Sequence, residues 1–278
     1  GQSTTSGGQY SVAMGYGCTS NGYASVALGS VCNANGVYSV ALARGSLAND
    51  SGSVCIGYHS NVLGKYATGF GAYTNASGDY STTMGYYANS NIKRGSFVYA
   101  DASSVTPTNS TANNQFMVRA SGGVIFYSNS AMTAGVSLPA GGGSWASVSD
   151  KTKKEHFKSE DAIVILNKLS QIEVSSWNYK TQDASIRHIG PMAQDFYKAF
   201  KFGESDTTIT TIDIDGINLI AIQALAKKTE ELKAKANEVN ELKAMIDKLQ
   251  KEKTTLETRV LSIENKLITD KETVSNSQ

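Results

Sequence analysis

The sequence has 278 residues and a formal net charge of +1, so its bulk charge does not indicate nucleic-acid binding. It contains no apolar run long enough to cross a lipid bilayer, which argues against membrane insertion. No signal peptide or initiator Met is visible, so we expect a fragment of a longer protein.

Charge and glycine are distributed unevenly along the chain. Residues 149–278 are rich in acidic and basic residues, whereas residues 1–148 contain no Glu and most of the 26 glycines. The charged residues of the first part are Arg44, Asp50, Lys65, Asp79, Lys93, Arg94, Asp101 and Arg119. Two regions of different composition therefore meet near Ser149.

The three cysteines, Cys18, Cys32 and Cys55, follow no metal-binding spacing and cannot form an even disulfide framework. We expect them to be small, buried apolar residues. The sequence also shows no phosphate-binding loop and no convincing pair of carboxylates. We therefore expect neither a metal nor a cofactor.

The first part of the chain repeats with a period of 14 residues. Six similar strings, from SVAMG to STTMG, end at Gly15, Gly29, Ala43, Gly57, Gly71 and Gly85. A second series comprises Gly8, Gly22, Gly36, Asp50, Gly64 and Gly78. Small and apolar residues alternate within each string, which predicts a strand, and glycines permit the bends between strands. Each copy is therefore predicted to be one coil of a stacked β-roll.

One thin coil buries little surface, so the coils must stack and a second face must meet other chains. The motif and its period resemble the head repeats of trimeric autotransporter adhesins over residues 8–95. This resemblance implies parallel, left-handed β-rolls packed three around an axis, which makes the expected partner a homotrimer. The tyrosines Tyr10, Tyr38, Tyr66 and Tyr80 either pack between coils or chains, or contact a host surface receptor or glycan.

The period ends at Ser96. The string NQFMVRASGGVIFYSN, residues 114–129, predicts a strand pair around Gly122 and Gly123. The string SLPAGGGSW predicts a flexible link. We therefore expect residues 96–148 to form a neck of short strands.

Residues 149–224 predict a small α/β domain. Residues 160–169 have apolar side chains at helical spacing, and residues 172–179, 186–190 and 208–215 have the character of strands. We expect Pro191 to occupy the first position of a helix and Asp215 to cap the last helix.

The last helix is predicted to continue as a coiled coil over residues 225–270. One heptad position holds Leu225, Leu232, Val239, Ile246, Lys253, Val260 and Leu267. The position three residues later holds Leu242, Leu249, Leu256 and Ile263. A seven-residue apolar period indicates a coiled coil but does not fix the number of helices, for which the β-roll resemblance favours three.

The stretch VSDKTKK, residues 148–154, combines a serine with a lysine five residues later. A serine hydroxyl needs a base, and a lysine amine, with an ordinary pKa of about 10.4, is a base only in its neutral form. Burial, or neighbouring cations such as Lys151 and Lys153, favours that neutral form. Ser–Lys pairs are a known arrangement for activating a nucleophile, although the pattern also occurs in polar linkers.

The motif S-D-x-x-x-K is followed by I-G-x-x-A-Q, within IRHIGPMAQDF at residues 186–196. Together they resemble the C-terminal intramolecular chaperone and auto-processing domain of phage tail spikes and tail fibres, of the endosialidase type, over residues 144–235. The resemblance implies that Ser149 is the nucleophile, Lys154 the general base and Asp150 a positioning residue. The family often has arginine within the motif, where this chain has Thr152.

Such a domain helps three chains to align and fold, and then cuts itself off. The motif does not fix which side of Ser149 is cut, although the chemistry favours the bond between Val148 and Ser149. A Ser–His pair is the alternative to the Ser–Lys pair. His156 is close enough in sequence for a Ser–His pair, whereas His188 is expected to be a packed residue within a strand.

The sequence thus predicts a mainly β protein with a trimeric β-roll over residues 1–95, followed by the neck, the small α/β chaperone domain and the coiled coil. The expected function is that of a phage-type tail fibre or spike, or of an adhesin fragment, on a virion or an extracellular cell surface. The expected activity is self-cleavage by a serine endopeptidase. The alternative is a trimeric surface adhesin that is not cleaved and keeps its C-terminal trimerisation anchor.

Overall fold

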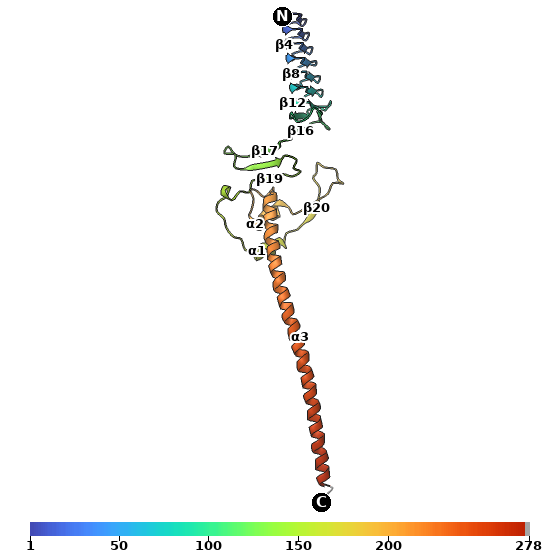
Figure 1. Cartoon of the computed structure of the whole chain (residues 1–278), viewed down its shortest axis with the longest axis vertical. Coiled ribbons are helices and arrows are strands. Elements are labelled where there is room, and N and C mark those ends of the chain that lie inside the picture. Colours follow the sequence, from blue (N-terminus) through green and yellow to red (C-terminus); the bar gives the residue numbers. More distant parts are fainter. Residues whose placement is uncertain (276–278) are drawn as a thin grey trace. The chain divides into compact units, whose positions relative to one another are not determined.

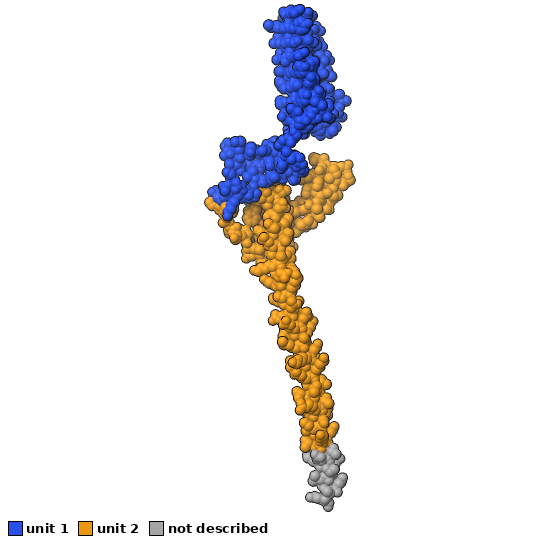
Figure 2. Space-filling model, in the orientation of Figure 1, with its two compact units in different colours: residues 1–155 blue, residues 156–278 orange. Residues whose placement is uncertain are grey.

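The computed structural model describes residues 1–275, with side chains described through residue 268. The chain forms two compact units, Gly1–Glu155 and His156–Gln278, which Figure 2 shows in different colours. Among the described residues, no helix combines the length and the apolar character that a membrane crossing requires.

The first unit begins with a β-solenoid of about seven turns, built from two parallel sheets (Figure 1). The sheet of longer strands contains β2 (Val12–Tyr16), β4 (Val26–Ser30), β6 (Val40–Arg44), β8 (Val54–Tyr58), β10 (Thr68–Ala72), β12 (Thr82–Tyr86), β14 (Phe97–Ala100) and β16 (Phe116–Arg119). The sheet of short strands contains β1 (Thr5–Ser6), β3 (Thr19–Ser20), β5 (Asn33–Ala34), β7 (Leu47–Ala48), β9 (Asn61–Val62), β11 (Asn75–Ala76), β13 (Ala88–Asn89) and β15 (Thr108–Asn109). The predicted stacked β-roll is confirmed.

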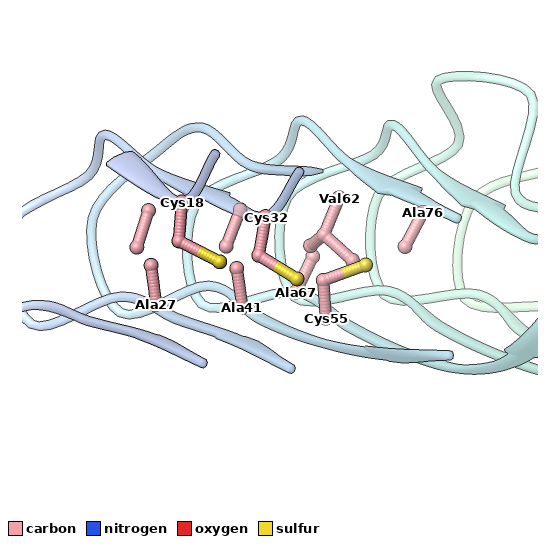
Figure 3. Close-up of a cluster of buried hydrophobic side chains, with 10 residues drawn as sticks. Cys18, Ala27, Cys32, Ala41, Cys55, Val62, Ala67 and Ala76 are labelled. Atoms are coloured by element: carbon pink, nitrogen blue, oxygen red, sulfur yellow. The ribbon is translucent and has the colours of Figure 1, made fainter. Parts of the chain in front are cut away.

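Equivalent residues of successive coils lie directly above one another. Val26 pairs with Val40 and Ala27 with Ala41, each one repeat apart. Because successive side chains of a strand point to opposite faces, the alanines point inward and the larger apolar neighbours point outward. Figure 3 shows the resulting narrow core, in which Ala27 and Ala41 are fully buried.

The repeat glycines are required where neighbouring coils approach closely. Gly29 has a φ of +131°, and a Cβ added there would lie 1.9 Å from the carbonyl oxygen of Ala43. A side chain at this position would therefore collide with the backbone of the next coil.

The stack continues beyond the last regular repeat. Phe97 in β14 pairs with Thr82, and Phe116 in β16 pairs with Phe97. The 14-residue period ends because the connecting loops become longer, while the strands keep stacking. The strand pair predicted around Gly122 and Gly123 is wrong, since β16 joins the solenoid and β17 (Gly123–Tyr127) pairs antiparallel with β18 (Gly135–Pro139).

An ion pair closes the last coil. Arg119 Nε lies 3.1 Å from Asp101 Oδ1, and the guanidinium also donates to the carbonyl oxygens of Tyr86 and Ser104. The hydroxyl of Ser103 and the backbone N–H of Ser121 donate to the same carboxylate. These hydrogen bonds, that of Ser103 first, hold the pKa of Asp101 well below its usual range.

In its described part, the second unit has three helices and one small sheet: α1 (Ala162–Leu169), β20 (Ser175–Trp177), β21 (His188–Gly190), α2 (Ala193–Phe200) and α3 (Thr211–Ser275). Its core is formed by Ile165 of α1, Phe196 and Phe200 of α2, and Ile217 of α3. The small α/β region predicted from the sequence is confirmed.

The start of α3 differs from the prediction, because the expected third strand at residues 208–215 is largely helical. The hydroxyl of Thr210 accepts the backbone N–H of Asp213 over 3.1 Å and caps the helix, so Asp215 is not the cap. Ile214 and Ile217 then reach the core at helical spacing, which outweighs their strand propensity. Likewise, α2 starts after the N-cap residue Met192, so Pro191 precedes the helix rather than opening it.

The predicted apolar seam of α3 has no partner within the single chain. Leu232 is 59% exposed and Ile246 is 52% exposed. A helix of this length with an unburied apolar seam is consistent with a coiled coil.

Candidate functional site

Ser149 follows directly after a sheet that fixes the chain on its N-terminal side. The strand β19 (Ala146–Ser147) pairs antiparallel with β18. The next residue, Val148, still donates its backbone N–H to the carbonyl oxygen of Gly135, over 3.3 Å. The peptide bond between Val148 and Ser149 therefore lies at the end of an ordered strand. The contact with Gly135 could not be predicted from the sequence, because it depends on pairing with a non-adjacent segment.

A short turn fixes the chain on the other side of Ser149. Asp150 is the N-cap of the 3₁₀ helix η1 (Lys151–Lys153), and its Oδ1 accepts the backbone N–H of Thr152 over 2.8 Å. The backbone N–H of Lys153 donates to the Asp150 carbonyl oxygen, and that of Lys154 donates to the Lys151 carbonyl oxygen. This turn reverses the chain and returns Lys154 towards Ser149.

The two residues predicted to form the dyad are in contact. Lys154 Nζ donates a hydrogen bond to Ser149 Oγ over 2.9 Å, and both side chains are exposed in the single chain. A general base must lie within hydrogen-bonding reach of the proton that it removes, and this distance meets that requirement. In its protonated form the amine donates to the hydroxyl, and in its neutral form it can accept the hydroxyl proton.

Asp150 is bonded to the turn rather than to the dyad. Its hydrogen bonds with Thr152, and secondarily the nearby Lys153 ammonium, lower the pKa of its carboxyl group. Asp150 therefore remains ionised at neutral pH and continues to cap η1. This arrangement gives the positioning role predicted for Asp150 a structural basis.

The two histidines considered from the sequence lie in the second unit. His156 has a left-handed backbone, with φ +55°. His188 lies in β21, where its ring contacts Trp177 and its Nε2 lies 2.8 Å from Gln182 Oε1. His188 is thus a packed residue, as expected.

The cysteines are part of the solenoid core. Cys18, Cys32 and Cys55 are fully buried free thiols, and Figure 3 shows them among the core alanines. Burial raises the pKa of Cys55 to about 11 and also raises that of Cys32. The prediction of small, buried apolar residues is confirmed.

The exposed tyrosines contact aromatic residues of neighbouring coils. Tyr66 and Tyr80 stack with their ring centres 5.5 Å apart, while Tyr10 and Tyr38 each meet Tyr23 edge to face. Packing between coils thus uses part of each ring, which supports the first of the two roles expected for these tyrosines. Contact with a receptor or a glycan remains a prediction.

Comparison with known proteins identifies the segment that contains the dyad. Residues 149–202 match the family model Peptidase_S74, described as chaperone of endosialidase. The match begins at Ser149 and extends through α2, so it includes both S-D-x-x-x-K and I-G-x-x-A-Q. In a comparison with curated proteins, none matches the chain. The chain thus carries a C-terminal chaperone domain of the endosialidase type, which follows a β-solenoid in the sequence.

Proposed function

We propose that this chain is one subunit of a trimeric, phage-type tail fibre or spike, or of a related surface fibre. Its C-terminal domain aligns three copies, assists the folding of the solenoid and then detaches by cutting the bond between Val148 and Ser149. The observation that carries this proposal is the 2.9 Å hydrogen bond between Lys154 Nζ and Ser149 Oγ, inside a segment that matches the chaperone family.

The first chemical step moves an acyl group from nitrogen to oxygen. Neutral Lys154 removes the hydroxyl proton of Ser149 as Oγ attacks the carbonyl carbon of Val148, closing a five-membered ring. The carbon–nitrogen bond then breaks, and Lys154 returns the proton to the departing nitrogen. The products of this step are an ester between Val148 and Ser149 Oγ, and a free amine on Ser149.

Water completes the cleavage. It attacks the ester carbonyl with Lys154 as general base, and Ser149 Oγ leaves with a proton. The N-terminal fragment then ends in the carboxylate of Val148, and the C-terminal fragment begins with the amine of Ser149. The hydroxyl is regenerated, and each chain is cut once.

The single chain holds the dyad in a latent form. Both side chains are exposed to water in the single chain, whereas a general base must be in its neutral form to accept the hydroxyl proton. If assembly of three chains removes water from this region, the neutral amine is favoured, because burial disfavours the charged form. Cleavage then follows correct assembly rather than preceding it.

Two apolar surfaces of the chain support association with further copies. The outer face of the longer-strand sheet carries an in-register row that includes Phe70, Met84 and Tyr99, all partly exposed. The seam of α3 is the second surface. Contiguous exposed apolar surfaces on a protein often mark interaction sites.

A detachable chaperone suits a fibre of this kind. Packing of three solenoids around a common axis depends on contacts between chains, and assembly of separate chains is slow and depends on their concentration. A domain that brings three chains into register early shortens this search. Its removal afterwards leaves the fibre without the element that helped it to refold, which makes assembly hard to reverse.

The proposal is tested with matched substitutions next to and within the dyad. Ser149→Ala and Lys154→Ala are each expected to give full-length chains that still form trimers, measured by denaturing electrophoresis and by native mass. The controls Ser147→Ala and Lys158→Ala, at exposed positions on either side of the dyad, are expected to be cleaved like the wild type. Cleavage of the Ser149→Ala protein would exclude the proposed nucleophile. A wild-type trimer that is never cleaved would instead favour a permanent trimerisation anchor.

A further inference from the structure

An apolar stripe runs along the exposed side of α3 and is interrupted by one cation. Over residues 239–267 its members follow one another at intervals of three or four residues, and around the cation they are Ile246, Leu249, Lys253, Leu256, Val260 and Ile263. All are exposed in the single chain. Within this described stripe, Lys253 is the charged member, and it occupies the same heptad position as Ile246 and Val260.

The neighbours of Lys253 on its own helix are acidic. Lys253 Nζ lies 3.5 Å from Glu257 Oε1, and Glu252 Oε1 lies 4.0 Å from Lys248 Nζ. In a parallel coiled coil, each seam side chain enters a hole formed by four residues of the facing helix. When two copies of α3 are aligned in the same register, the hole that receives Lys253 includes the residue just before Lys253 of the facing helix. That residue is Glu252 of the neighbouring copy. In this register, the ammonium group of Lys253 lies next to the carboxylate of Glu252 of the neighbouring helix.

This match is lost when the helices slip by one heptad. The positions that correspond to Glu252 one heptad earlier and one heptad later are Met245 and Arg259. A slipped Lys253 would face either a side chain without charge or a second cation. Glu252 would then lie beside an apolar layer instead of a lysine.

Charges beside the seam favour the same alignment. In a parallel, in-register pair of helices, the flanking positions bring Glu238 of one copy to Lys243 of the next, and Arg259 to Glu264. Both pairs are oppositely charged. The flanking pair formed by Glu252 and Glu257 has like charges, and Lys253 lies between them.

We propose that Lys253 sets the register of α3, so that the partner this helix recognises is a parallel, in-register copy of the same chain. This inference rests on the proposed function, which requires several α3 helices to associate. A lysine in an apolar seam lowers the stability of a coiled coil while making its alignment specific, because misaligned forms place Lys253 opposite Met245 or Arg259 instead of Glu252 of the neighbouring helix. Correct alignment at the C-terminus would then carry the chaperone domains and solenoids of several chains into matching positions.

The test uses the full chain with Ser149→Ala, so that α3 stays attached, and compares charge reversals on one helix. Lys253→Glu is expected to abolish the trimer at concentrations where the parent is fully trimeric. The matched control is Lys251→Glu, which makes the same change of charge two residues away, off the stripe, and is expected to leave the trimer intact. The double variant Glu252→Lys with Lys253→Glu exchanges the two charges and is expected to restore the trimer. Native mass and the helical circular dichroism signal on heating report each result.

A further variant separates alignment from stability. Lys253→Leu completes the apolar seam and is expected to raise the thermal midpoint of α3, because it removes a cation from the seam. A lowered midpoint would contradict the placement of Lys253 between helices. If the parent is trimeric and Lys253→Glu behaves like Lys251→Glu, the register role is overturned while the trimer stands. If the parent itself is not trimeric, the proposed function fails first.

Discussion

Lys154 Nζ lies 2.9 Å from Ser149 Oγ, although the two residues are five positions apart in the sequence. The contact depends on the single turn η1, which Asp150 caps, and on the strand β19, which ends just before Val148. The proposed nucleophile and its base are thus held by local structure within the first unit. Assembly therefore does not need to bring them together, and has only to change their solvation.

Loss of the N-cap of η1 is expected to slow cleavage. Asp150→Ala removes the acceptor for the Thr152 N–H, so Lys154 is held less well, and we expect cleavage to slow by about fivefold, as for loss of a typical N-cap. Asp150→Asn keeps an acceptor oxygen and is expected to cleave close to the wild-type rate. A time course of fragment formation measures both. Equal slowing by Asn and Ala would show that the negative charge matters rather than the cap.

The hydrogen bonds that the Asp101 carboxylate accepts, that of Ser103 first, predict how acid affects the solenoid. The pKa of Asp101 is lowered in the folded chain, so its contribution to stability is complete above the ordinary aspartate range and is lost as the pH falls below that range. Asp101→Asn is therefore expected to lower the thermal midpoint at pH 7, and to lower it much less in strong acid. Thermal unfolding at a series of pH values measures this. A difference that stays constant down to strong acid would contradict the prediction.

Gly52 lies against the ring of Tyr66, and a side chain added at this position is expected to lower the stability of the solenoid. Its φ is +63°, and a Cβ added there would lie 2.5 Å from Cδ1 of Tyr66. Gly52→Ala is expected to cost about 1–2 kcal/mol from the left-handed backbone alone, with more from displacement of the ring. The control is Gly143→Ala, where an added Cβ would meet nothing within 4 Å. Equal thermal midpoints for the two variants would contradict this packing.

The three cysteines are expected to react slowly with alkylating reagents in the folded protein, because their thiols are buried. Because the thiolate is the reactive form, burial and the raised pKa of Cys55, to about 11, both slow its alkylation at pH 8. The folded protein is expected to take up almost no iodoacetamide, and the unfolded protein three equivalents, one for each cysteine. Intact mass after a timed exposure measures the uptake. Rapid labelling of the folded protein would show that the solenoid core opens readily.

The solenoid could be predicted from the sequence because its repeat is local and regular. Each coil repeats the same alternation, so the pairing of Val26 with Val40 follows from the period alone. The end of the solenoid could not be predicted in this way. The strands β14 and β16 keep stacking after their loops lengthen, and β16 leaves its neighbour β17 to pair with β14, which is distant in the sequence.

In the second unit, too, local sequence patterns were not sufficient to predict every element. Residues 208–215 have the β-branched character of a strand, yet Ile214 and Ile217 belong to a helix because they complete a core with α1 and α2. Ser149 and Lys154 could be recognised from their spacing, since one turn joins them. The anchor of Val148 on Gly135 could not, because it requires the pairing of β18 with β19.

Self-cleavage at Ser149 is tested most directly by the mass of the chains in assembled, wild-type protein under denaturing conditions. We expect two chains, residues 1–148 ending in a carboxylate and residues 149–278 beginning with the amine of Ser149. Cleavage is expected to become faster as the pH rises, because the base must be neutral. An assembled trimer that keeps only the intact 29.5 kDa chain after prolonged incubation at neutral and alkaline pH would contradict it.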